Sequence, residues 1–289
     1  MHQSLTQQLP DIVVQGHLQS SLFLAELDRR PPITCRSRPW AFSAMADGPY
    51  PEQLLRNQLA CGGDLAVLAA LLSGHASLPR LRGRVQLVCF DPSRSELAPI
   101  AGATEEAEAQ RLTALTMRLL IMRSLLSDSG LLCVRLAHEP TPCARQVLSA
   151  VLGRENSAQD ILWHTPPMEP MASTALRQGH WHVYARQRQR VKPALPDPTV
   201  RRAQWPGPSS SPEQALLRHL LAVFTEPGDT VVSFNAAPEV AAVAATSALQ
   251  WILTAPDEPA GEALQQHLSK HPGVHSERSF ERQVVSSPG

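Results

Sequence analysis

The sequence has no excess of charge of either sign and almost no lysine. Lys plus Arg and Asp plus Glu each number 26 among 289 residues, so the formal net charge is zero. Only Lys192 and Lys270 are lysines, and every other residue in the basic count is arginine. The balance excludes a histone-like polycation and an acidic tail protein, and it leaves room for a local basic patch.

Paired cysteines are also absent. The five cysteines are an odd number, and none of them forms a Cys-x-x-Cys motif. Cys89 and Cys133 lie inside apolar runs, which is typical of buried small hydrophobic residues. We therefore expect neither a disulfide scaffold nor a zinc ribbon, and a reducing compartment fits this usage.

No apolar run is long enough for a membrane helix, which needs about 18 residues. The most apolar segment, residues 113–126, is interrupted by Arg118 and Arg123. The first residues contain neither a basic region nor an apolar core of the kind found in secretory signals. The expectation is a cytoplasmic chain without a membrane association.

Strand-like and helix-like segments alternate along most of the chain. Apolar runs at residues 85–90, 131–136, 230–234 and 250–254 predict strands, and residues 161–164 and 181–185 are shorter candidates. Helical spacing predicts helices within residues 17–27, 65–72, 112–126, 146–152, 212–224 and 240–249. Residues 127–130 (Ser-Asp-Ser-Gly) are expected to form a turn. The alternation predicts an α/β fold with a doubly wound, mostly parallel sheet.

Proline is concentrated where this alternation fails. The chain has 26 prolines, about 9%, against a usual content of about 5%. Many of them lie in residues 165–211, which we expect to be an irregular linker or insertion. Arg186, Arg188 and Arg190 alternate within it, so an extended chain would place three guanidinium groups on one face.

In doubly wound sheets, ligands bind at the carboxyl ends of strands. The two places to examine are therefore residues 91–95 and 233–239, which follow predicted strands. Residues alone do not identify the ligand.

Five segments, taken in order, resemble the permuted amino-methylating (N6-adenine or N4-cytosine) DNA methyltransferases, which include the modification subunits of type III restriction systems. They are Gly63-Asp64-Leu65, VQLVCFDPSRS, MRLLIMRSLLSDSGLLCVRL, RQVLSAVLGRENSAQDILWH and SSSPEQALLRHLLAVFTEPGDTVVSF. The resemblance implies a Rossmann-like S-adenosylmethionine-dependent methyltransferase fold over residues 51–255. It places a recognition-region-like insertion at residues 165–211. Residues 1–50 and 256–289 are then unassigned extensions.

The family's catalytic Asp-Pro-Pro-Tyr tetrapeptide corresponds to Asp91-Pro92-Ser93-Arg94. In the family, the Asp carboxylate and the first Pro carbonyl orient the target amine, and the aromatic residue stacks on the flipped base. The two acceptors are retained here, whereas the second proline and the aromatic residue are not. Arg94 could stack its guanidinium plane on a base. The alternative is an ordinary Asp-Pro turn after a buried strand.

The family's glycine-rich cofactor loop is replaced as well. The resemblance assigns cofactor contacts to Asp64, near the adenine, and to Ser233, Asn235, Ala237 and Glu239. Ala237 and Glu239 stand where glycines would let the backbone approach the ligand. The expectation is S-adenosylmethionine as cofactor if the protein is active, and no cofactor if it is not.

The most basic stretch coincides with the family's recognition region. Its candidate DNA-binding residues are Arg186, Arg188, Arg190, Lys192, Arg201 and Arg202. A charged, solvated sheet edge is an equal alternative. His180, Trp181 and His182 could contact bases, although a strand face is the commoner role, and no metal site is expected.

Together these observations predict a catalytically degenerate DNA methyltransferase homologue. It would act by binding DNA or by pairing with an active methyltransferase subunit or a second copy of itself. An active site-specific DNA (adenine-N6) methyltransferase with unusual motifs is the alternative, and an α/β protein unrelated in function is a third.

Overall fold

The computed structural model describes residues 4–29, 35–39, 57–74, 78–95, 97–136, 143–165, 177–191, 212–235, 249–269 and 281–285. All structural statements below concern these residues.

A nine-stranded mixed sheet forms the centre of the described structure, in the order β1-β9-β2-β8-β7-β3-β4-β6-β5. The strands are β1 (Cys35–Pro39), β2 (Gln58–Cys61), β3 (Val85–Phe90), β4 (Leu126–Arg135), β5 (Ser157–Thr165), β6 (Arg177–Ala185), β7 (Thr230–Phe234), β8 (Gln250–Ala255) and β9 (Glu281–Val285). The six strands from β9 to β4 run parallel, and β1, β6 and β5 join the two edges antiparallel. The predicted doubly wound, mostly parallel sheet is confirmed.

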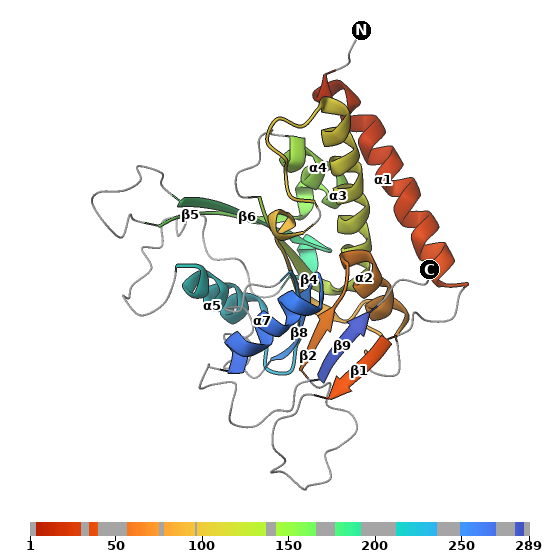
Figure 1. Cartoon of the computed structure of the whole chain (residues 1–289). Helices are drawn as coiled ribbons and strands as arrows, with labels where there is room; N and C mark the ends of the chain where they lie inside the picture. Colours follow the sequence, from red (N-terminus) through yellow and green to blue (C-terminus); the bar gives the residue numbers. More distant parts are fainter. Residues whose placement is uncertain are drawn as a thin grey trace, which may run out of the picture.

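Helices cover both faces of this sheet (Figure 1). On one face lie α1 (Leu5–Leu27), α2 (Asp64–Ser73), α3 (Glu105–Leu125) and α4 (Cys143–Leu152), which share one apolar core with the sheet. On the other lie α5 (Pro212–Phe224) and α7 (Glu258–Ser269), which form a second core. Three short 3₁₀ turns, η1 (Pro92–Arg94), η2 (Arg154–Asn156) and η3 (Arg188–Arg190), complete the described elements.

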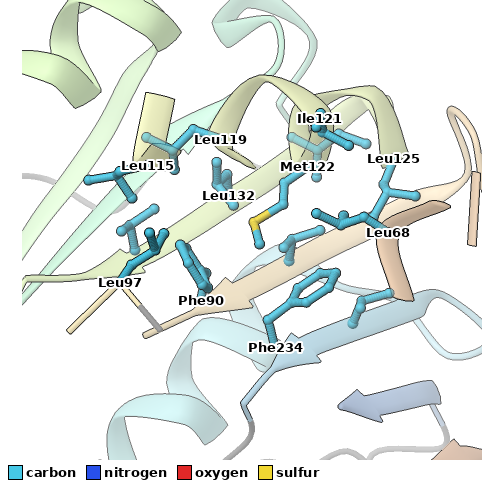
Figure 2. Close-up of a cluster of buried hydrophobic side chains, with 14 of the residues drawn as sticks. Leu68, Phe90, Leu97, Leu115, Leu119, Ile121, Met122, Leu125, Leu132 and Phe234 are labelled. Carbon is cyan, nitrogen blue, oxygen red and sulfur yellow. The ribbon is translucent and has the colours of Figure 1, made fainter. Parts of the chain in front are cut away.

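The central strand β3 is buried on both faces, as its continuous apolar sequence predicted. Leu87 and Cys89 belong to the core under α5 and α7, whereas Val88 and Phe90 belong to the core under α3. Figure 2 shows Phe90 in the latter core, together with Phe234 of β7 and Met122 of α3. The two cores fix the strand on both sides and therefore fix the residues that follow it.

Four of the cysteines, Cys61, Cys89, Cys133 and Cys143, are buried and free. Burial raises the pKa of the Cys89 thiol to about 12, and it also raises the pKa of Cys133, which lies beside Cys89 in the sheet. They act as small apolar residues, as predicted.

The predicted turn at residues 127–130 is wrong. Strand β4 begins at Leu126, directly after α3, and its pairing with β3 shifts register between Val85 and Leu87. The Gln86 side chain holds the bulge, because its amide oxygen accepts hydrogen bonds from the hydroxyls of Ser127 and Ser129, at 2.9 and 3.2 Å. Polar residues that suggested a turn are therefore bound inside the sheet. The helix expected at residues 240–249 lies outside the described residues.

Elements from both ends of the chain pack on the central part. Helix α1 begins at Leu5, earlier than the predicted start at His17, and lies along α3. Strand β9 pairs with β2, and β1 pairs with β9. The division of the chain at residues 50 and 255 stays a prediction. Among the described residues, no helix combines the length and apolarity that crossing a membrane requires.

Candidate functional site at the carboxyl ends of β3 and β7

The strand order reverses direction between β3 and β7, which is where open α/β sheets form their ligand crevice. Phe90 and Phe234 are the last residues of these strands and are aligned with each other in the parallel pairing. Their rings meet edge to face, with centroids 6.4 Å apart and planes at 89°. Asp91 and Asn235 follow directly, so two of the predicted site residues extend from this packed aromatic pair.

Asp91 is 7% exposed, and both its carboxylate oxygens have protein donors. Its Oδ1 accepts hydrogen bonds from the Ser93 backbone N–H at 3.0 Å and from the Ser93 hydroxyl at 2.5 Å. Its Oδ2 lies 3.2 Å from Nη1 of Arg135, in an ion pair with the last residue of β4. The carboxylate therefore caps η1 and neutralises a neighbouring charge.

The Pro92 carbonyl oxygen is engaged in the same turn. It accepts hydrogen bonds from the Ser95 backbone N–H at 3.1 Å and from the Ser95 hydroxyl at 2.9 Å. The predicted acceptor pair, Asp91 and Pro92, is thus held by donors from its own loop. Ser93 is exposed, and the side chain of Arg94 lies outside the described residues.

A buried ion pair anchors the loop that follows. Arg111 of α3 donates to both carboxylate oxygens of Glu108, at 2.8 and 2.7 Å, and its Nη1 donates to the Leu97 carbonyl at 3.1 Å. The side chains of Arg111 and Glu108 are 8% and 7% exposed. This anchor ties the segment after Asp91 to α3, so the turn is fixed at both ends.

Asp64 and Asn235 meet although 171 residues separate them in the chain. Asp64 is the first residue of α2, and its Oδ1 accepts a hydrogen bond from Nδ2 of Asn235 at 3.0 Å. Asn235 has a left-handed backbone, with φ of 50°, and its N–H donates to the Thr254 hydroxyl at 2.9 Å. Ser233 is buried within β7 between Cys89 and Leu253 of the flanking strands. Ala237 and Glu239 lie outside the described residues.

Burial dominates the electrostatics of this pair. Desolvation raises the pKa of Asp64, and the Arg118 charge and the Asn235 hydrogen bond oppose that rise. Desolvation likewise lowers the pKa of Arg118 on α3, and Asp64 opposes it. Arg118 thus balances an acidic group that α2 carries into the interior.

Two unpaired acceptor atoms decide whether an adenine amine could bind between Asp64 and Asn235. Oδ2 of Asp64 and Oδ1 of Asn235 are buried acceptors without a hydrogen-bond partner. Acceptors of this kind match the N–H groups of an adenine amine in chemistry. Both atoms are, however, sealed from solvent, so the described residues present no open place for that group.

The prediction that Arg186, Arg188 and Arg190 lie on one face of an extended chain is wrong. Strand β6 ends at Ala185, and the chain then bends into η3. The Arg190 guanidinium lies 2.5 Å from Oδ2 of Asp128, and the Arg186 guanidinium lies 4.0 Å from Oδ1 of Asp128 and donates to the Leu126 carbonyl. Arg188 donates its backbone N–H to Asn156. Asp128, in the β4 bulge, thus contacts two of the three guanidinium groups. Lys192, Arg201 and Arg202 lie outside the described residues.

The histidine-rich strand is a structural element. His182 is buried, and its Nδ1 lies 2.8 Å from Oδ1 of Asp160, which also pairs with Arg145 at 2.5 Å. The His182 hydrogen bond is the largest cause of a lowered pKa at Asp160. Trp181 is buried in the core under α5 and α7. The strand-face alternative is confirmed for Trp181 and His182, and the side chain of His180 lies outside the described residues. Within the described part of the chain, no three His, Cys, Asp or Glu side chains are grouped to hold a metal ion.

Sequence reasoning missed Arg111, Arg118 and Arg135. Arg135 interrupts the otherwise apolar run LLCVRL, and Glu108 precedes Arg111 by three residues, a spacing typical of helical ion pairs. Those signals could have marked the two residues as paired charges.

The sheet order, the reversal at β3 and β7 and the helices on both faces form a Rossmann-like α/β fold that the chain shares with solved methyltransferase structures. The chain is similar to TTHA0409 of Thermus thermophilus, provisionally identified as a DNA modification methylase, with 19% identity, a TM-score of 0.53 and coverage of 80% of this chain and 100% of that one. A structure of that protein complexed with S-adenosyl-L-methionine aligns with 18% identity, a TM-score of 0.51 and the same coverage.

The cytosine-N4-specific PvuII DNA methyltransferase aligns with 16% identity and a TM-score of 0.50, over 74% of this chain and 87% of that one. No protein-family profile and no curated protein matches the sequence. At these identities the similarity establishes the fold.

Proposed function

We propose that this chain is a DNA methyltransferase homologue of the amino-methylating (N6-adenine or N4-cytosine) type that has kept the fold and lost catalysis. Support for the family comes from the five sequence segments in their order and from the fold similarity to TTHA0409 and PvuII DNA methyltransferase. Support for lost catalysis comes from the turn at Asp91.

The observation that carries the proposal is that both acceptors expected to orient a target amine are already bound. Asp91 accepts from Ser93 and pairs with Arg135, and Pro92 accepts from Ser95. An amine would have to compete with Arg135 for Oδ2 of a largely buried carboxylate, and displacing Arg135 would leave a charge without its partner. Amine methylation depends on holding the nitrogen in a near-attack position, and here donors from the chain itself already compete for both acceptors.

The cofactor side supports the same proposal. Asp64 and Asn235 hydrogen-bond to each other, and their remaining acceptors are sealed from solvent. Binding of S-adenosylmethionine between these residues would require the pair to open. The cofactor-binding roles of Asp64, Ser233, Asn235, Ala237 and Glu239 remain proposals, and we expect weak binding or none.

A protein of this kind acts by binding. The described part of the basic stretch supports a protein partner over DNA, because Asp128 pairs with Arg190, lies 4.0 Å from Arg186 and so offsets one of the arginine charges. DNA contact would then depend on Lys192, Arg201 and Arg202. Such a partner could be an active methyltransferase subunit.

The test is calorimetric titration of the purified chain with S-adenosylmethionine and S-adenosylhomocysteine, with adenosine as a control and thermal melts alongside. We expect no heat and no melting shift at millimolar ligand. Saturable binding would overturn the cofactor part of the proposal, since a hundredfold excess over Kd would stabilise the fold by about 2.7 kcal/mol. The alternative of an active DNA (adenine-N6) methyltransferase, using Asp91, Pro92 and Arg94, would then be favoured.

A further inference from the structure

A cleft lies at the edge of the sheet opposite to Asp91. Because β6 runs antiparallel to β4, its last residue, Ala185, lies toward the amino end of β4, and Arg186 and Gln187 follow there. These two residues, the last turns of α3 and the second half of α1 line a cleft of about 430 Å³. Figure 1 shows the two helices side by side. A cleft of this volume is large enough for a small molecule.

The charge of this cleft has one sign. Its lining includes the guanidinium groups of Arg123 and Arg186 and the imidazole of His17, and no carboxylate is among its described lining residues. The groove between α1 and the first half of α3 instead carries the carboxylates of Glu105 and Glu106, and no arginine is among the described residues that line it. The cleft at the end of α3 is therefore the one of the two that suits an anion.

The two guanidinium groups have capacity for a ligand. Arg123 is half-buried and has no ion pair among the described residues. Arg186 donates from Nη1 to the Leu126 carbonyl, which anchors the side chain, and its Nη2 has no partner in the described part of the chain. Asp128 lies 4.0 Å from Arg186 and also pairs with Arg190, so one carboxylate faces two cations. Like charges that line one cleft repel each other, and a bound anion would offset that repulsion.

The rest of the lining offers one neutral donor and an apolar wall. Ser20 and Ser124 donate their hydroxyls to carbonyls of their own helices, at 2.9 and 3.3 Å. The hydroxyl of Ser21, which is exposed, has no such partner among the described residues. Leu24 and Leu120 add apolar surface beside these polar groups.

We propose that this cleft binds the phosphate group of a small ligand, with Arg123 and Nη2 of Arg186 as its charged donors and Ser21 as a neutral donor. A guanidinium group presents paired N–H donors that match the oxygens of a phosphate. Leu24 and Leu120 would contact the organic part of a phosphate ester. The site uses no residue of the crevice at Asp91, so it does not rest on the proposed function.

The described charges favour a small phosphate over the backbone of DNA. A duplex presents a row of phosphates and is held by several cations along its length. The next described arginine along the chain, Arg190, lies 2.5 Å from Asp128 and is thus already paired. The cleft therefore offers a single position for a phosphate.

The first test is calorimetric titration of the full chain with inorganic phosphate and with adenosine 5′-monophosphate, and adenosine is the control without a phosphate. We expect saturable binding of both phosphates and no heat with adenosine. Tighter binding of the ester would support an organic phosphate that contacts the leucines. Equal affinities would support inorganic phosphate itself as the ligand.

Two variants assign the binding to this cleft. Arg123→Gln removes one charged donor and should weaken binding at least tenfold. Arg154→Gln is its control, because Arg154 is exposed, lies in η2 and does not line the cleft. Ser21→Glu places a carboxylate in the cleft and should abolish binding. Leu22→Glu adds the same charge one residue further on α1, at a position that does not line the cleft, and should bind as the unmodified chain does.

Melting temperatures close to that of the unmodified chain verify that these surface variants fold. Absence of saturable binding with both phosphates would overturn the proposal, and so would binding that is indifferent to Arg123→Gln and Ser21→Glu. A DNA duplex that binds in an Arg123-dependent manner, without binding of either small phosphate, would also overturn it and would assign the cleft to the DNA backbone.

Discussion

The carboxylate of Asp91 and the guanidinium of Arg135 form an ion pair, with 3.2 Å between Oδ2 and Nη1, at the ends of adjacent parallel strands. The pair follows from register, because Phe90 of β3 aligns with Val134 of β4 and the next residue of each strand is therefore a neighbour. Arg135 binds Oδ2, the carboxylate oxygen of Asp91 that does not accept from Ser93. In the proposed function, the ion pair that stabilises the turn competes with a target amine for this oxygen.

Asp91 and Arg135 should be coupled in stability. We expect a double-mutant cycle of Asp91→Asn and Arg135→Gln to give a coupling of about 1–2 kcal/mol, within the range for contacting side chains. Urea denaturation of the four proteins measures it. A coupling below about 0.3 kcal/mol would mean that the ion pair contributes little and that Asp91 is available to other partners.

Gly16 should be required for the packing of α1 on α3. A Cβ at this position would overlap the Thr116 side chain and approach the Thr113 carbonyl to 3.2 Å. We expect Gly16→Ala to destabilise the protein by about 1–3 kcal/mol through overpacking. Gly63→Ala is the control, because Gly63 has ordinary φ and nothing lies within 4 Å of the place that its Cβ would occupy. It should change the free energy of unfolding by less than about 0.5 kcal/mol. Equal effects would contradict the packing argument.

Asp160 should contribute stability that depends on pH. Its pKa is lowered in the folded state, first by the hydrogen bond with His182. Its contribution is therefore present above the ordinary Asp pKa of about 3.9 and is lost as the pH falls through the lower folded value. Because Asp160 is half-exposed, we expect less than about 1 kcal/mol. The Tm difference between the unmodified chain and Asp160→Asn should shrink between pH 7 and pH 3. A difference that does not shrink between pH 7 and pH 3 would exclude this linkage.

The buried cysteines should resist alkylation. Cys89 and Cys133 combine burial with a raised pKa, and Cys61 and Cys143 are also buried. Because the thiolate is the reactive form, iodoacetamide should label these four only after unfolding. Peptide mass mapping of native and denatured samples measures this. Rapid labelling of Cys89 in the native protein would show that the β3–β4 core opens.

Much of the fold could be predicted because its central elements are locally encoded. Strands β3 and β7 were predicted to the residue, since each is a continuous apolar run ended by a polar residue and a turn. The carboxyl-end position of the site followed from the α/β pattern. The order of the motif segments added the methyltransferase type of fold.

The remaining features depend on contacts between distant segments. The Asp64–Asn235 pair needs the sheet order, which no local pattern contains. Two local predictions were wrong for the same reason. Gln86 hydrogen-bonds to a serine after Leu126, and the polar residues there form a bulge in place of a turn. Asp128, in that bulge, contacts Arg186 and Arg190, which therefore do not form the row that an extended chain would give. In both places a tertiary partner overrides the local preference.

The most direct test of the central claim is transfer of a tritiated methyl group from S-adenosylmethionine to unmethylated genomic DNA. Asp91→Ala, which removes the carboxylate, is measured beside the unmodified chain at equal concentration, and an active adenine-N6 methyltransferase serves as the positive control. The account predicts that both forms of this protein incorporate no more label than a sample without protein. Incorporation by the unmodified chain that Asp91→Ala abolishes would contradict it and would establish Asp91 as a catalytic residue.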